Sequence, residues 1–86
     1  MIDRERNPVE WALMLTDLEE VGEHIQSLIE EMHADGTIDD EDFRVRIFHM
    51  ISHLNRAWNG RNHIGESLDE VRDELSQVPK DFFPVG

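Results

Sequence analysis

The sequence predicts an all-α protein in which two long helices form an antiparallel hairpin and a short third helix follows. Apolar residues recur at spacings of three and four along two long segments. Residues that end or begin helices separate these segments, and no stretch shows the alternation that is typical of a β-strand. The length of 86 residues is that of one small domain, residues 1–86.

The first helix is predicted over about residues 8–34. Asn7 is a suitable N-cap, and Pro8 suits the first helical position because its missing N–H has no partner there. Asp35 and Gly36 are expected to end the helix, with Gly36 in the left-handed conformation. The stripe that indicates a helix consists of Trp11, Leu15, Leu18, Gly22, Ile25, Ile29 and Met32.

The second helix is predicted over about residues 39–60. Asp39 is its expected N-cap, and Asn59 and Gly60 its expected end. A connection of so few residues between two long helices favours an antiparallel hairpin. The apolar face of this helix consists of Phe43, Ile47, Met50, Ile51, Leu54, Ala57 and Trp58.

A third helix is predicted over about residues 67–78, followed by an apolar tail over 79–86. Ser67 is its expected N-cap, and Pro79 is expected to end it. This helix is less than half as long as the first, so it is too short to cover the whole hairpin. We therefore expect two hairpins to pair as a dimeric four-helix bundle. The alternative is a monomeric bundle of three helices.

Charge is distributed unevenly along the chain. The net charge is −12, from 20 acidic and 8 basic residues, yet residues 43–65 contain four arginines and no acid. Such an acidic chain is not expected to bind nucleic acid directly. The sequence has no cysteine, which excludes disulfides and thiolate chemistry, and no apolar run long enough to cross a membrane. We expect a cytoplasmic protein without a cofactor.

Two charged stripes flank the predicted apolar faces. One lies on the second helix and contains Arg46, His49, His53 and Arg56. The other lies on the first helix and contains Asp17, Glu20, His24 and Glu31. Opposite charges on neighbouring helices fix pairing and orientation, as in coiled coils. The basic stripe either meets the acidic stripe of its own chain or binds an acidic partner.

The function that this pattern favours is that of a non-enzymatic, acidic adaptor or regulator that binds protein partners, with a second copy of itself as one of them. The sequence shows no nucleophile motif and no phosphate-binding glycine loop. The end of the second helix combines arginine and tryptophan, which are common interface anchors, with several asparagines. The predicted partner-binding residues are Arg46, His49, His53, Asn55, Arg56, Asn59, Arg61 and Asn62.

Two alternative functions come from other residues. His49 and His53 are four residues apart on a helix, so both imidazoles can bind one metal ion, with a third ligand from His24, Glu20 or a second copy of the chain. In the other alternative, an inhibitor or immunity-type protein imitates the charge of nucleic acid toward a basic enzyme. That function requires a row of exposed acids, namely Glu19, Glu20, Glu23, Glu30 and Glu31.

Overall fold

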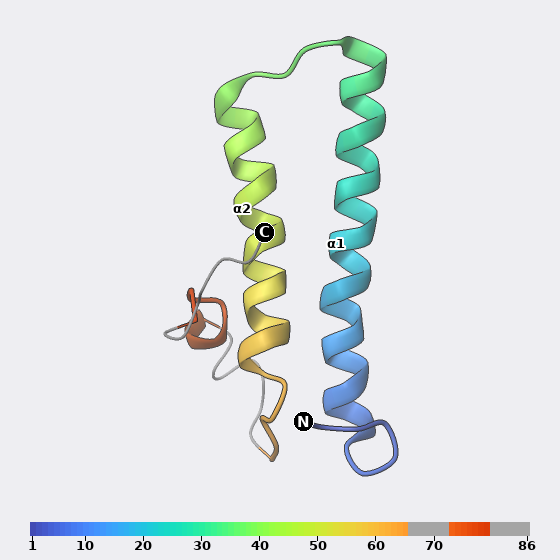
Figure 1. The fold of residues 1–86 in the computed structure, drawn as a ribbon, viewed down its shortest axis with the longest axis vertical. Coiled ribbons are helices and arrows are strands. Elements are labelled where there is room, and N and C mark those ends of the chain that lie inside the picture. Colours follow the sequence, from blue (N-terminus) through green and yellow to red (C-terminus); the bar gives the residue numbers. More distant parts are fainter. Residues whose placement is uncertain (66–72, 80–86) are drawn as a thin grey trace.

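The computed structural model describes residues 1–65 and 73–79. Two long helices, α1 (Pro8–Asp35) and α2 (Asp40–Asn59), lie side by side and antiparallel (Figure 1). Of the residues predicted to form the third helix, 73–75 are helical and 76–78 are not, so this helix ends about three residues earlier than predicted. The described ranges contain no β-strand. The predicted all-α hairpin is thus confirmed. The start of the third helix and the tail beyond Pro79 lie outside the described residues.

The two long helices begin and end within one residue of the predicted positions. Pro8 occupies the first helical position of α1. After α1, Gly36 has a φ of 69° and its N–H donates to the carbonyl of Met32 at 2.9 Å. This left-handed conformation closes a helix with least strain when the residue is glycine. Asn7 and Asp39 stand at the predicted N-caps, although in the described structure neither side chain makes a capping hydrogen bond.

The buried apolar core of the described residues is small. It consists of Leu28 from α1, Met50 from α2 and Ile2 from the segment before α1. The N–H of Ile2 donates to the carbonyl of Arg61 at 2.7 Å, which ties the start of the chain to the end of α2. The remaining buried residue is a histidine, His53, whose exposed fraction is 3%.

The predicted apolar stripes do not face each other across the hairpin. On α1, the positions that contact α2 carry mostly polar side chains, and the stripe through Leu18 and Ile25 lies about a third of a turn further round. On α2, the stripe through Leu54 and Trp58 is likewise rotated away from the residues that contact α1. The rotation has the same direction as on α1 when each helix is viewed from its own N-terminus. Because the helices are antiparallel, both displacements carry the stripes to the same face of the hairpin. These four side chains are 38–47% exposed.

The described part of the third segment lies against a different side of α2. The amide Nδ2 of Asn55 donates to the carbonyl of Ser76 at 3.0 Å, and that of Asn59 donates to the carbonyl of Leu75 at 2.6 Å. Both asparagines are rotated about 100° from Leu54 and Trp58 around the helix axis. Residues 73–79 therefore leave the apolar face of the hairpin open.

Over the described ranges, neither helix has an apolar stretch of the length needed to cross a membrane.

Candidate functional site

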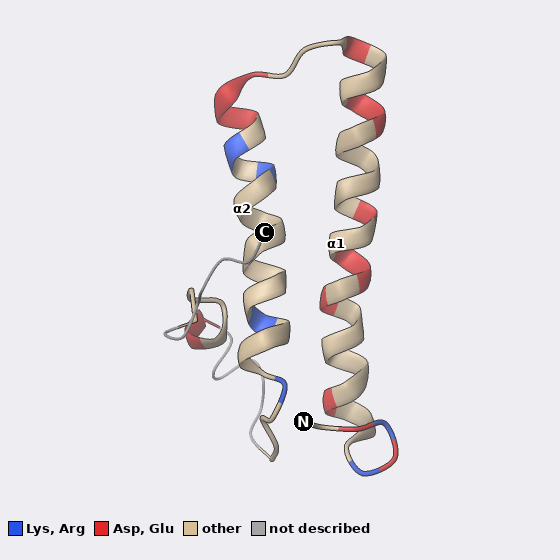
Figure 2. Cartoon of the chain, viewed as in Figure 1, with Lys and Arg blue, Asp and Glu red and all other residues tan. Residues whose placement is uncertain are grey.

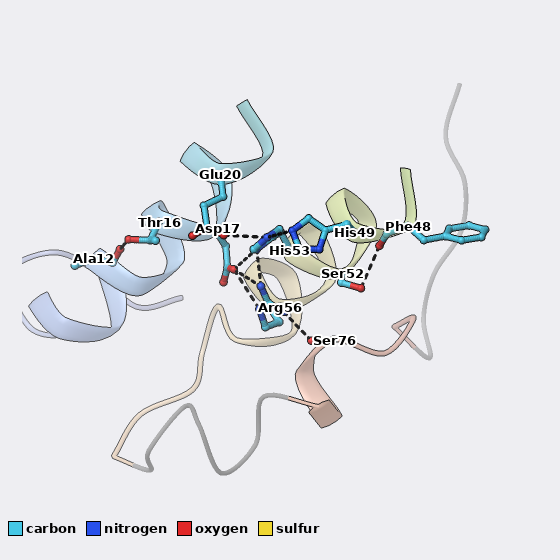
Figure 3. Close-up of polar contacts among 10 residues, drawn as sticks. All are labelled: Ala12, Thr16, Asp17, Glu20, Phe48, His49, Ser52, His53, Arg56 and Ser76. Atoms are coloured by element: carbon cyan, nitrogen blue, oxygen red, sulfur yellow. Dashed lines mark hydrogen bonds and ion pairs between the residues drawn. The ribbon is translucent and has the colours of Figure 1, made fainter. Parts of the chain in front are cut away.

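A cluster of ionisable side chains lies between α1 and α2, near the middle of the hairpin (Figure 3). Residues three and four apart share one face of a helix, and each helix contributes three members at such spacings. The antiparallel arrangement brings the two sets together. We call this the histidine cluster; its members are Asp17, Glu20, His24, His49, His53 and Arg56.

His53 is at the centre of the histidine cluster. Its Nδ1 lies 2.8 Å from Oδ1 of Asp17, and its Nε2 lies 2.9 Å from Oε2 of Glu20. The same Nε2 lies 3.2 Å from Nε2 of His49. An imidazole this deeply buried must satisfy both ring nitrogens with partners from the protein, because water does not reach it.

Each neutral tautomer of His53 satisfies only part of these contacts, because Nδ1 lies beside both an acceptor, Oδ1 of Asp17, and a donor, Nη2 of Arg56. In one, Nδ1–H donates to Asp17 and the lone pair of Nε2 faces Glu20 and His49. In the other, Nε2–H donates to Glu20, and Nδ1 accepts from the guanidinium of Arg56, whose Nη2 lies beside it. The group that occupies the space next to Nε2 therefore decides which tautomer is present.

Asp17 joins the two helices through a single carboxylate oxygen. Its Oδ1 accepts from Nε of Arg56 at 3.1 Å and from Nη2 at 2.9 Å, in addition to the contact with His53. The side chain of Asp17 is 19% exposed, and that of Arg56 is 14% exposed. Arg56 also donates from Nη1 to Oγ of Ser76 at 3.2 Å. This ion pair connects α1, α2 and the described end of the third segment.

The three histidines of the cluster lie close enough to act on one ligand. Their ligand nitrogens all lie within 4.8 Å of one another. His24 and His49 are exposed, whereas His53 is buried, so the cluster is open to solvent on one side. Desolvation, followed by the positive charges that His53 and His24 can carry, lowers the pKa of His49. These effects favour the neutral ring of His49, which has a lone pair available.

A second ion pair lies nearer the connection between the helices. Arg46 contacts Glu31 of α1 through Nη1 and Asp42 of its own helix through Nε, the latter at 3.2 Å. The hydrogen bond with Glu31 raises the pKa of Arg46. Figure 2 shows the resulting pattern, with acids along α1 and arginines on α2. The predicted match between the two charged stripes of one chain is confirmed.

The residues that the sequence placed in one partner-binding surface occupy three environments. Arg46, His49, His53 and Arg56 contact α1 or lie beside it. Asn55 and Asn59 bond the backbone of residues 75–77.

At the end of α2, the guanidinium of Arg61 lies over the ring of Trp58 at 3.7 Å from the ring centroid, and Asn62 is exposed. Apart from Asn62, the described residues of the predicted surface have contacts inside the chain.

The row of exposed acids that the inhibitor function requires is interrupted. Glu20 contacts His53, and Glu31 pairs with Arg46. Glu19, Glu23 and Glu30 remain exposed. The acidic surface of α1 is therefore narrower than the sequence suggests.

A cavity of about 210 Å³ adjoins the histidine cluster. Asp17, Glu20 and Arg56 form part of its wall, and Leu75 of the third segment closes one side. Sequence periodicity could not locate it, because its wall combines residues that are far apart in the chain.

Comparison of the chain with protein-family models, with curated proteins and with solved structures finds no match.

Proposed function

We propose that the chain is a non-enzymatic protein-binding module that works as a homodimer, with the apolar face that the described residues leave exposed packed on that of a second copy. The observation that carries this proposal is the position of the two apolar stripes. The stripes of α1 and α2 share one face, and their side chains are about 40% exposed there, as in Leu18, Ile29 and Leu54. Two such faces together supply the core of a four-helix bundle.

The surface area of the chain is larger than that of a compact monomer. The solvent-accessible area is 6703 Å², whereas a compact monomer of the same mass exposes about 5,300 Å². An elongated hairpin with exposed apolar side chains is expected to show such an excess. The radius of gyration, 14.9 Å, is also above the value of about 12 Å for a compact chain of this length.

The further partner of this dimer is a protein with a basic surface. Each copy carries a net charge of −12, and Glu19, Glu23 and Glu30 of α1 are exposed about a third of a turn from the apolar stripe. Such a field speeds the approach of cationic proteins and weakens as salt is added.

Sedimentation equilibrium of two matched variants tests the dimer. Leu54→Asp places a charge in the apolar face, and Val45→Asp places the same charge on the opposite side of α2, at a side chain that is 57% exposed. Leu54→Asp is expected to weaken the dimer by more than about 30-fold, because a central apolar contact contributes about 2 kcal/mol or more. Val45→Asp should leave it unchanged.

Circular dichroism of both variants shows whether the helices are retained. Equal dissociation constants for two helical variants would refute the proposed interface. A wild-type chain that sediments as a monomer would refute the homodimer itself.

A further inference from the structure

We propose that the histidine cluster binds one divalent transition-metal ion of the zinc type per chain, with His24, His49, His53 and Glu20 as the ligands. His24 and Glu20 come from α1, one turn apart, and the other two ligands come from α2, also one turn apart. The site therefore needs only one chain and does not depend on the proposed dimer.

The distances from Nε2 of His53 to the ligand atoms of His49 and Glu20 are close to those of a tetrahedral site. Two ligands that bind one zinc ion at 2.0–2.2 Å in tetrahedral geometry are about 3.3 Å apart. Nε2 of His53 lies 3.2 Å from Nε2 of His49 and 2.9 Å from Oε2 of Glu20. The larger separations among the three histidines, up to 4.8 Å, involve His24. Its exposed ring can close this gap by turning about its own side-chain bonds.

The lone pairs of these groups indicate a cation. When Nδ1–H of His53 donates to Asp17, the lone pair of Nε2 points toward a carboxylate oxygen and a second imidazole nitrogen. A single proton between these groups can form a hydrogen bond in only one of the two contacts that Nε2 of His53 makes, with Glu20 or with His49. A metal ion accepts all of the lone pairs at once, and it selects this tautomer of His53.

Asp17 supplies the outer contact that metal-binding histidines usually have. A histidine ligand typically donates its other N–H to a carboxylate, which orients the ring and makes it a stronger ligand. The contact of 2.8 Å between Nδ1 of His53 and Oδ1 of Asp17 has this form. Arg56 in turn holds the same carboxylate oxygen through two nitrogens.

The ligand types select the class of metal. Three imidazoles and one carboxylate suit zinc and its neighbours, whereas magnesium and calcium prefer sites made only of oxygen. Four protein ligands complete a tetrahedral shell, which is typical of structural rather than catalytic zinc. The ion would cross-link α1 and α2 at a point where the helices meet through polar side chains. Because such a contact buries little apolar surface, a bound ion would stabilise the hairpin there.

Calorimetric titration of the metal-free full chain with Zn²⁺ tests the site. We expect one equivalent of zinc to bind and to raise the melting temperature, because an ion that binds only the folded chain stabilises it. Mg²⁺ and Ca²⁺ at the same concentration should not reproduce this rise. Co²⁺ should show the visible absorption of a four-coordinate ion.

Matched histidine variants assign the ligands. His49→Ala removes an exposed ligand and should weaken zinc binding by more than 100-fold, beyond the 10–100-fold that an outer contact contributes. Asp17→Asn, which alters only the outer contact, should weaken zinc binding by about 10–100-fold. His33→Ala removes an exposed histidine of α1 outside the cluster and should leave the affinity within about two-fold of wild type.

Three results would overturn the site. One is the absence of both binding heat and a melting shift with zinc. The second is equal loss of affinity in His49→Ala and His33→Ala, which would indicate scattered binding to the acidic surface. The third is an equal melting shift with Mg²⁺, which would indicate only neutralisation of charge.

Discussion

Replacing Asp17 with alanine should destabilise the hairpin more than the loss of any exposed acid. The substitution removes the oxygen that accepts from His53 and from two nitrogens of Arg56, and it leaves both partners without their anion. Loss of one member of a fully buried ion pair costs about 3–5 kcal/mol. Asp17 is 19% exposed, so water offsets part of this loss, and we expect about 2–3 kcal/mol.

The assay is urea unfolding followed by circular dichroism, with EDTA present and one fixed protein concentration. In a domain of this size, a loss of 2–3 kcal/mol corresponds to a fall in melting temperature of about 8–24 °C. Glu19→Ala is the matched control, because Glu19 is an exposed acid half a turn away on α1. Its effect should stay within about 0.5 kcal/mol. A loss in Asp17→Ala no larger than that of the control would refute the role given to this ion pair.

Further predictions concern other parts of the hairpin. Leu28→Ala should lower the free energy of unfolding by about 3 kcal/mol in the same urea assay, because Leu28 is 2% exposed and the substitution leaves a cavity. Gly36→Ala should lower it by about 1 kcal/mol, because alanine at a φ of 69° is strained although the space around it is open. Arg46→Ala should change stability far less than Leu28→Ala, and by less still at high salt, because its ion pair with Glu31 is partly exposed. Zinc binding, measured by calorimetry, should weaken as the pH falls through the range in which histidines take up protons, because protons compete with the metal.

The hairpin could be predicted because local signals mark its ends. Pro8 and Gly36 have backbone requirements that depend little on distant contacts, so they locate the ends of α1 from the sequence. The spacing of four between His49 and His53 likewise places both rings on one face of α2. The histidine cluster itself was anticipated in part, since Glu20 and His24 were candidates for the third ligand.

The rotation of each helix about its axis could not be predicted. Periodicity shows which residues share a face, but it does not show which face meets which neighbour. The apolar stripe through Leu54 suggested that the two helices meet along their apolar faces. In the structure they meet where Asp17 binds Arg56 and where Glu31 binds Arg46, so the apolar face is turned outward.

The bonds of the asparagines on α2 were also beyond prediction from the sequence. Asn55 and Asn59 donate to carbonyl groups of residues that are 16 to 21 positions further along the chain. Backbone carbonyls of this kind carry no sequence signal, because every residue has one. The sequence therefore does not distinguish an exposed asparagine that binds a partner from an asparagine that bonds the backbone of its own chain.

The homodimer is tested by the molar mass of the wild-type chain, measured by size-exclusion chromatography with light scattering at low and at high salt. We expect twice the chain mass of 10.1 kDa under both conditions, because apolar contacts hold the dimer and salt does not weaken them. A mass of one chain at both salt concentrations would contradict it, and would mean that the apolar face of α1 and α2 does not pair two copies.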